Sequence, residues 1–383
     1  MQRTAFIFAF ALSSTCLGQI ELPEGFEIVD LVSNGDTVRV PAVNNCGEIV
    51  FPQAAPEHEW EEIYHYDNGP MDRISFQGVW TWSPDINDAG TIVWAVGASD
   101  ILMLRDEQIV WLGDGTGGVS INNLDHVVWD LFAPITCADE CTVYFYDGAE
   151  VTLVSDSIFS NQAPELNDYD DIVWTRYDDC PSPWTYEIIL HTKSGEVSLP
   201  SAETQGGTPT INNAGQVVWT AAHTIESWEE GVTTLLTDWG DNPSLNNFGD
   251  IHFIRWHDEN DTWQAWYYQV STGTPTFYRL TDDDRWQLNG DINDYGEAVW
   301  YSFASPYNPD ADCGLHYLRR IRNGDVDFDG DVDLDDFATL PACMTGPVET
   351  DRLCDCRFFD MDHDRDIDLS DLTLFQGAFS AAP

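Results

Sequence analysis

A short pattern of polar and apolar positions recurs seven times between residues 43 and 300. Each copy starts with an aliphatic residue and an asparagine, continues through a mostly polar stretch, and ends in apolar residues that close on Trp or Phe. The first and last of these asparagines are 249 residues apart, so their mean spacing is about 41 to 42 residues, which is typical of propellers and other repeat arrays. The lead asparagines are Asn44, Asn87, Asn122, Asn167, Asn212, Asn246 and Asn293.

The polar stretch of each copy predicts a four-residue turn led by the asparagine. Asn is favoured at the first position of a type I turn and Gly at the last, and five copies carry Gly there. Asp125 and Asp170 replace Gly in the other two copies, and Asp tolerates a left-handed backbone better than most residues. The apolar residues after the turn place side chains on both faces of a strand, so we expect that strand to be buried on both sides.

Further strand-like segments joined by a tight turn follow the repeat in several copies, as in residues 143–155. A short segment before the asparagine, such as 208–210, could add an edge strand. A sheet of three or four strands cannot bury both faces alone, whereas a ring of seven leaves few exposed edges. We predict a mainly β, seven-bladed β-propeller over residues 19–321, with residues 26–40 completing the last blade; an open β-solenoid or a two-part sandwich array is the alternative.

The tryptophans suggest where a ligand could bind. Five of them occupy the closing position of the repeat, and this regularity indicates core packing rather than sugar stacking. Six irregularly placed ones are better candidates for stacking on a glycan, and they are densest in residues 254–268, where ordinary strand aromatics remain the favoured interpretation. These six are Trp60, Trp184, Trp239, Trp256, Trp263 and Trp266.

Near the C-terminus, twelve residues alternate aspartates with apolar residues in the spacing of an EF-hand calcium loop. Gly330, at position 6, permits the sharp turn, and Val332, at position 8, should point into a core. The bound ion would cancel the repulsion among the carboxylates. The predicted ligand positions are Asp325, Asp327, Asp329, Asp331, Asp333 and Asp336.

A second loop repeats this register between residues 360 and 371. Arg365 replaces the glycine at position 6, so we expect a strained turn and a weaker second calcium site. Short helices should follow the two loops, at 337–340 before Pro341 and at 372–379. The predicted ligands of this loop are Asp360, Asp362, Asp364, Asp366, Asp368 and Asp371.

Two resemblances follow from these motifs. The paired loops, with Asp at position 12 and the helix starts DLDDF and DLSDL, resemble a type I dockerin domain within residues 322–383, which implies calcium binding and a cohesin partner on a scaffold or cell surface. Pro341 and the cysteines between the loops depart from that pattern, so a structural or sorting role stays open. The turn-and-strand unit is similar to the NxxG-type, HAF-like repeats of secreted bacterial proteins, which implies an architecture and no catalytic residues.

Charge narrows the set of partners. With 67 acidic and 15 basic residues, the chain has a formal net charge of −52 and repels phosphate backbones and anionic lipid surfaces. We therefore expect no nucleic acid partner and no membrane insertion, and cations are the natural ligands. Arg3, the apolar run 5–12, and small residues before Gln19 predict a signal peptide over 1–18, and hence a secreted or cell-surface protein.

Eight cysteines remain after the signal peptide, and an even number in an exported chain favours disulfides over zinc. Cys137 and Cys141 are close enough to form a local bridge, and four more cysteines cluster around the acidic module. Cys46 and Cys180 are left over and could pair across the fold. The four clustered cysteines are Cys313, Cys343, Cys354 and Cys356.

No catalytic motif stands out in the sequence. GxSxG, HExxH and P-loop patterns are missing, and 67 acidic residues do not single out a carboxylate pair. The favoured function is non-catalytic binding or surface architecture. The alternative is a propeller-type carbohydrate-active enzyme, a glycoside hydrolase or lyase carried by a dockerin, which needs carboxylates of raised pKa in the central funnel beside unpaired aromatics. Purely structural repeats are the third possibility.

We predict that Asp329→Ala removes most of the calcium affinity of the first loop, because position 5 supplies a ligand oxygen. Calorimetric calcium titration of the parent and the variant checks this, and the second loop should bind more weakly than the first. Identical isotherms for the two proteins would show that the ligand assignment is wrong.

Overall fold

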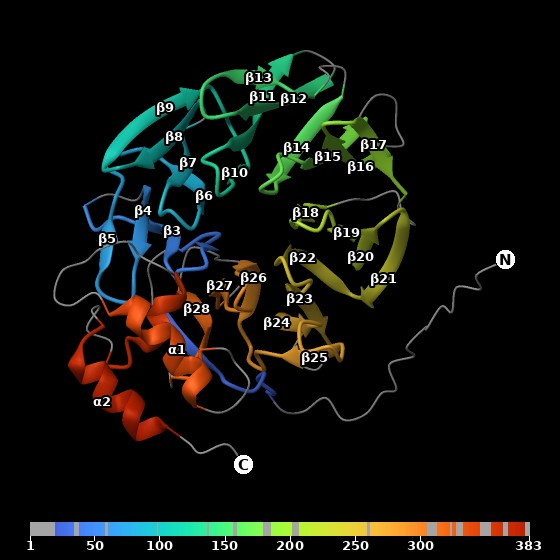
Figure 1. Ribbon diagram of the computed structural model, residues 1–383. Helices are drawn as coiled ribbons and strands as arrows, with labels where there is room; N and C mark the ends of the chain where they lie inside the picture. The colour runs from blue at the N-terminus through green and yellow to red at the C-terminus, as the bar shows by residue number, and fades with distance from the viewer. Residues whose placement is uncertain are drawn as a thin grey trace.

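The structure is a computed structural model, and 28 strands in its described residues form seven four-stranded antiparallel sheets around a ring (Figure 1). The predicted signal peptide lies outside the described residues. Among those described, no helix has the length and hydrophobicity needed to cross a membrane. The structure describes residues 20–33, 38–57, 60–97, 99–135, 138–155, 159–178, 185–200, 207–258, 261–304, 312–321, 324–326, 332–344, 354–362 and 367–379.

The first six blades each take four consecutive strands, ordered from the channel outward. Blades 1 to 3 consist of β2 (Ala42–Val43), β3 (Ile49–Ala54), β4 (Glu61–Tyr66), β5 (Met71–Arg73); β6 (Thr81–Ile86), β7 (Ile92–Val96), β8 (Asp100–Arg105), β9 (Gln108–Gly113); and β10 (Val119–Ile121), β11 (Val127–Ile135), β12 (Ala138–Tyr146), β13 (Val151–Leu153). Blades 4 to 6 consist of β14 (Ser160–Leu166), β15 (Ile172–Asp178), β16 (Thr185–Thr192), β17 (Gly195–Leu199); β18 (Thr210–Ile211), β19 (Val217–Ala221), β20 (Thr224–Glu229), β21 (Val232–Asp238); and β22 (Gly240–Leu245), β23 (Ile251–His257), β24 (Thr262–Gln269), β25 (Thr276–Arg279).

The last blade is completed by the N-terminal strand, as predicted. Its inner strands are β26 (Trp286–Ile292), β27 (Ala298–Phe303) and β28 (Cys313–Arg320), and β1 (Phe26–Val32) pairs antiparallel with β28 as the outer strand. Only β1 joins this sheet, since Val38 bridges to Gln53 of blade 1 instead. The N-terminal segment therefore spans the seam between the last blade and the first, which identifies a closed propeller rather than a solenoid or a sandwich array.

Each repeated motif forms the turn between the innermost strand of a blade and its second strand. In blade 2, the N–H of Gly90 donates to the carbonyl of Asn87 at 3.0 Å, and the same bond occurs in the other six turns. The fourth turn residue has a positive φ in every blade, including 59° at Asp125 and 65° at Asp170. This left-handed backbone explains why Gly or Asp stands at the fourth position.

The tryptophans that close the repeat form the core between blades. Trp94, for example, is 0% exposed and packs in one cluster with Val50 and Ile63 of blade 1. All five are at most 1% exposed, which confirms packing over sugar stacking. They are Trp94, Trp129, Trp174, Trp219 and Trp300.

The lead asparagines form a closed ring of hydrogen bonds. The side-chain amide of each donates to the backbone carbonyl of the lead asparagine in the next blade at 2.9 to 3.1 Å, and Asn293 donates back to Asn44. Each Oδ1 also accepts the backbone N–H four residues later at 2.9 to 3.0 Å. All seven side chains are buried, at 3 to 4% exposure, so the same amide shapes its own turn and joins two blades.

The C-terminal module contains α1 (Leu334–Cys343), the 3-10 helix η1 (Cys354–Phe359) and α2 (Leu369–Ala378). Both α-helices begin three residues earlier than predicted, because Asp333 and Asp368 cap their N-termini in capping boxes. The first helix also continues through Pro341 instead of ending before it. Val332 is buried in the core of the module, as its place at position 8 predicts.

Two disulfides fix this module. Cys343 bonds to Cys356 within it, and Cys46 of the blade 1 turn bonds to Cys354 of η1. The expected pairing of Cys46 with Cys180 is therefore wrong, and Cys180 lies outside the described residues. The bridge closes a sequence separation of 308 residues, so cysteine spacing could not have revealed it.

A buried ion pair joins the module to the propeller beside that bridge. Arg357 donates to Glu297 Oε2 at 2.6 Å, and Tyr317 donates to the same oxygen at 2.9 Å. Burial alone would raise the pKa of Glu297, but the charge and hydrogen bond of Arg357 outweigh it and the pKa is lowered. Phe358 packs edge-on against Tyr295, with ring centroids 5.0 Å apart. The module is thus part of the propeller surface and not a separately tethered unit.

We predict that Asn212→Ala lowers the free energy of unfolding by about 2 to 4 kcal/mol, because it leaves the Asn246 carbonyl and the Ala214 and Gln216 amides without their partner. Urea denaturation checks this. Asn247→Ala is the matched control, since its exposed side chain should cost less than half as much. Equal losses for the two variants would contradict a special role for the lead asparagine.

Candidate functional site

The structure describes part of the predicted calcium site. Five predicted ligands lie outside the described residues: Asp327, Asp329, Asp331, Asp364 and Asp366. The other seven surround the starts of α1 and α2: Asp325, Asp333, Asp336, Asp360, Asp362, Asp368 and Asp371.

The aspartate at position 12 closes both loops in the same way. Asp336 is 1% exposed, and its two oxygens accept the N–H groups of Val326 at 2.6 Å and Asp333 at 2.8 Å. Asp371 is also 1% exposed and accepts from Met361 at 2.7 Å and Asp368 at 2.9 Å. The two segments therefore share a fold as well as a register.

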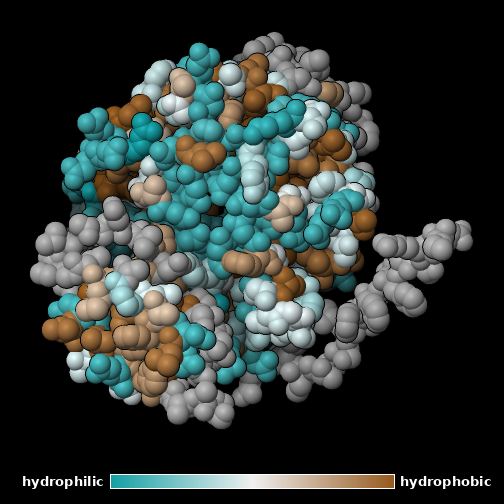
Figure 2. Space-filling view, viewed as in Figure 1, coloured by the Kyte–Doolittle hydropathy of each residue, from teal (hydrophilic) through white to brown (hydrophobic). Residues whose placement is uncertain are grey.

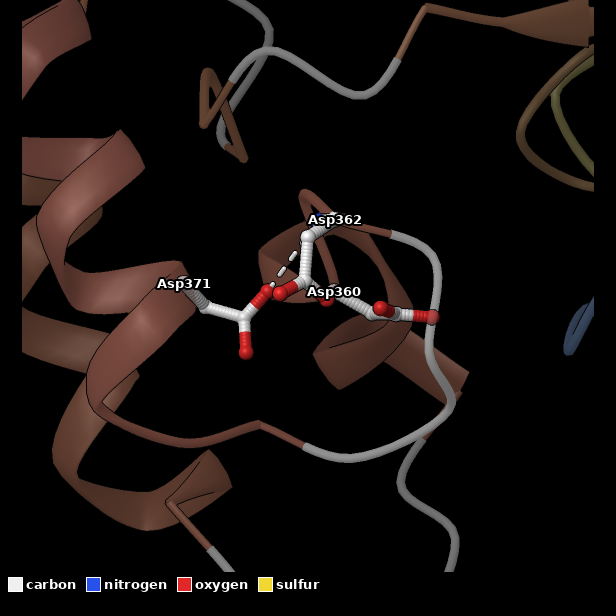
Figure 3. Close-up of side chains that lie close together, drawn as sticks. All are labelled: Asp360, Asp362 and Asp371. Atoms are coloured by element: carbon white, nitrogen blue, oxygen red, sulfur yellow. Dashed lines mark hydrogen bonds between the residues drawn. The ribbon is translucent and has the colours of Figure 1, made fainter.

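Three carboxylates converge in the second loop (Figure 3). Asp360, Asp362 and Asp371 each place one oxygen within 4.8 Å of the others. Calcium takes oxygen ligands at about 2.3 to 2.6 Å, so oxygens of one coordination shell lie within about 5 Å of one another. These residues hold positions 1, 3 and 12, and theirs is the one such cluster within the described part of the chain.

The central channel holds a second group of polar residues. The innermost strands enclose a cavity of about 350 Å³, whose wall includes the residue two positions before each lead asparagine. The lining contains no Arg, Lys, His or aromatic side chain among the described residues. The seven residues at this position are Ala42, Asp85, Ser120, Glu165, Thr210, Ser244 and Asp291.

The pKa values of the three carboxyl groups in this wall, those of Asp85, Glu165 and Asp291, are all raised. Burial, with a contribution from Asp291, raises the pKa of Asp85 to about 7. Burial and the charge of Asp85 raise the pKa of Glu165 to about 8, and burial raises that of Asp291. Near neutral pH, proton donors and acceptors therefore stand together in the channel.

The same carboxyl groups also tie neighbouring blades together. Asp85 accepts the N–H of Ile121 in the next blade at 2.8 Å, and Asp291 accepts that of Val43 at 2.9 Å. These residues are not among those predicted from the sequence. Their fixed place two residues before the lead asparagine is the pattern that could have found them.

At the turn end of the channel, the second residues of the seven turns surround a smaller cavity of about 150 Å³. Asp88 accepts from the side-chain amides of Asn45 and Asn123, both at 3.0 Å. Asp168 and Asp294 likewise stand between asparagines, so no two aspartates are neighbours in this ring. The middle of the ring is hydrophilic in Figure 2.

A chain of Ser, His and Asp crosses blade 7. Ser302 Oγ lies 2.7 Å from His316 Nε2, and His316 Nδ1 lies 2.7 Å from Asp30 Oδ1. These are the distances of a nucleophilic triad, but in such a triad the serine is accessible to the substrate and the aspartate is buried. Ser302 is 0% exposed, whereas the Asp30 side chain is 63% exposed. The chain fastens β1 to its blade and does not present a nucleophile.

The five candidate glycan-binding tryptophans that the structure describes do not line the channel cavity. Trp266 is 3% exposed and belongs to the core between blades 5 and 6. Trp256 and Trp263 pair edge-on across β23 and β24, with centroids 5.7 Å apart. Trp60 and Trp239 are exposed, and Trp184 lies outside the described residues.

No family model matches the sequence, and no curated protein matches it. Solved structures do match the fold. A streptogramin B lyase structure has 11% identity and a TM-score of 0.53, covering 77% of this chain and 98% of that one. The β-propeller domain of the trilobed protease from Pyrococcus furiosus has 9% identity and a TM-score of 0.54, covering 75% and 97%. Acylaminoacyl peptidase from Pyrococcus horikoshii has 13% identity and a TM-score of 0.51, covering 70% and 49%. At these identities the similarities show the fold, a seven-bladed propeller, and give no information about activity.

We predict that stability falls as the pH rises from about 4.5 to 8, because folded Glu165, with a pKa of about 8, keeps a proton that the unfolded chain releases. Glu165→Gln should reduce this fall. Urea midpoints at pH 5 and pH 8 measure it, with the exposed Glu150→Gln as the control. An unchanged pH dependence in the Glu165 variant would contradict the protonated state.

Proposed function

We propose that this is an exported, non-catalytic binding protein whose propeller carries a calcium-binding module on the face of its repeated turns. The observation that supports calcium most strongly is the duplicated loop. Asp336 and Asp371 close their loops with matching hydrogen bonds, and three carboxylates converge in the second loop. An all-oxygen, all-carboxylate donor set suits a hard cation such as calcium.

The calcium ion would offset repulsion among the aspartates of each loop. In the first loop, the ligands would be the alternate aspartates from Asp325 to Asp333 together with Asp336. In the second loop, they would be the alternate aspartates from Asp360 to Asp368 together with Asp371. Arg365 at position 6 of the second loop adds a positive charge where the first loop has Gly330. The second site should therefore be the weaker one.

The module also offers a surface for a protein partner, such as a cohesin-like or cell-surface protein. Leu334 and Leu369 occupy position 10 of the two loops, and they are 69% and 70% exposed. Large apolar side chains exposed at matched positions favour an interaction site. Because η1 is fixed to the propeller by a disulfide and an ion pair, a partner bound there would hold the propeller in a set orientation.

The second candidate is a carbohydrate-active enzyme with its site in the channel. It is favoured by Asp85 and Glu165, whose raised pKa values would let one carboxyl group act as acid and another as base. This candidate lacks an aromatic residue on which a sugar ring could stack, since none lines the cavity within the described chain. Hydrolysis or lysis of a polysaccharide that is lost in Glu165→Gln would favour this candidate over non-catalytic binding.

We expect the full-length protein to bind two calcium ions, and Asp362→Asn to weaken the second site about tenfold or more, because it removes a ligand charge. Calorimetry with and without a chelator measures this. Asp335→Asn is the matched control, since Asp335 is exposed and holds no ligand position. If the parent protein takes up no calcium, or if both variants bind alike, the proposed function is wrong.

A further inference from the structure

The docking site of η1 on the propeller is made of three residues from two adjacent turns. Counted from the lead asparagine, Tyr295 and Glu297 are the third and fifth residues of the blade 7 repeat, and Gly47 is the fourth residue of the blade 1 repeat. Arg357 donates to Glu297 at 2.6 Å and lies over the Tyr295 ring, 5.0 Å from its centroid. Its guanidinium fills the space where Gly47 would carry a Cβ. Phe358 then packs against Tyr295.

Parts of this site recur in other blades, because the turn sequence repeats. The third and fifth turn residues combine an aromatic ring with a carboxylate in three blades only. Blade 4 has Tyr169 and Asp171, blade 6 has Phe248 and Asp250, and blade 7 has Tyr295 and Glu297.

The copy in blade 6 is already filled from within the propeller. The carboxylate of Asp250 accepts from the Tyr267 hydroxyl at 2.9 Å and from the amide and hydroxyl of Ser271 at 2.9 and 2.7 Å. Gly296 of the next turn has the Tyr267 hydroxyl over it. An incoming arginine would therefore find neither a free carboxylate nor space.

The copy in blade 4 is open. Tyr169 is 61% exposed, and Asp171 is half-buried with the Asn167 amide 3.5 Å from its carboxylate. Gly215, the fourth residue of the blade 5 turn, has no atom of the described residues within 4 Å of the place where a Cβ would stand. Among the described residues, the seam of blades 4 and 5 thus presents the aromatic ring, the carboxylate and the unobstructed glycine of the η1 site without an occupant.

Charge at this seam favours a cationic partner. Asp168, Asp170 and Asp171 lie within four consecutive residues, and Lys193 lies beside them with its nitrogen 3.8 Å from Asp170. His126 contacts Asp170 at 2.7 Å. Two differences weaken the copy. Asp171 is one methylene shorter than Glu297, and Leu190 holds the register that Tyr317 holds in blade 7, so the hydroxyl that Tyr317 supplies is missing.

We propose that the seam of blades 4 and 5 is an interaction surface for a partner protein segment in which an arginine is followed by an aromatic residue. The arginine pairs with Asp171 and lies over Tyr169, and the aromatic side chain packs on the Tyr169 ring, as Arg357 and Phe358 do on blade 7. The surface lies across the ring from α1 and α2, so the module leaves it accessible (Figure 1).

The test uses a fluorescent peptide with the sequence of residues 353–360, in which both cysteines are replaced by serine. Fluorescence anisotropy with the full-length, oxidised protein should show saturable, salt-sensitive binding, and a peptide with Ala at the Arg357 and Phe358 positions should not bind. Tyr169→Ala and Asp171→Asn should each weaken binding about fivefold or more, and Tyr169→Phe should largely restore it.

Leu124→Ala is the matched control, because Leu124 is the exposed third residue of the blade 3 turn and lacks a carboxylate two residues later. It should bind the peptide like the parent protein. Absence of saturable binding, or equal binding to the Tyr169, Asp171 and Leu124 variants, would overturn the proposal. Both outcomes are independent of calcium, so they do not depend on the proposed function.

Discussion

One buried side-chain amide in each blade connects the local structure to the whole ring. The lead asparagine shapes its turn through Oδ1 and joins the next blade through Nδ2, and the series closes from Asn293 to Asn44. A residue that only shaped a turn could be exposed, whereas these seven are nearly inaccessible to water. Losing one amide therefore exposes unsatisfied groups in two blades at once. The pattern recurs because the contact between blades must recur.

The C-terminal module is attached to the propeller at one seam of the ring. Arg357 enters at the seam of blades 7 and 1 and pairs with Glu297, whose neighbour Asn293 donates to the same carboxylate at 2.9 Å. A buried ion pair alone adds little stability because of desolvation, but breaking one side of it is costly. Here the pair fixes the position of η1, and the disulfide from Cys46 to Cys354 holds it there. The seam where the chain closes its ring is also the seam that carries the module.

Much of this fold could be predicted from the sequence, because its determinants are local and repeated. The turn residues, the buried closing tryptophans and Val332 follow from spacing alone. The partner of Cys46 does not, because it depends on how distant segments meet after closure. For Asp85 and Glu165 the repeat marks only their position two residues before the lead asparagine, and that this position faces the channel follows from closure of the ring. Among 67 acidic residues, only the closed ring shows that Asp85, Glu165 and Asp291 line the larger cavity of the channel. The proposed calcium ligands, in contrast, are assigned from a register that a single loop already contains, and they stay a prediction.

Native-state hydrogen exchange at the seven turns is the most direct test of whether the lead asparagines form one cooperative ring. The informative amides are those that donate to the lead Oδ1, among them Glu48, Gln216 and Glu297. If the ring acts as a unit, they should all exchange with one free energy of opening, close to that of global unfolding. A markedly lower opening free energy for Glu48 and Glu297 would mean that the seam of blades 7 and 1 opens separately, which would contradict closure by the asparagine ring.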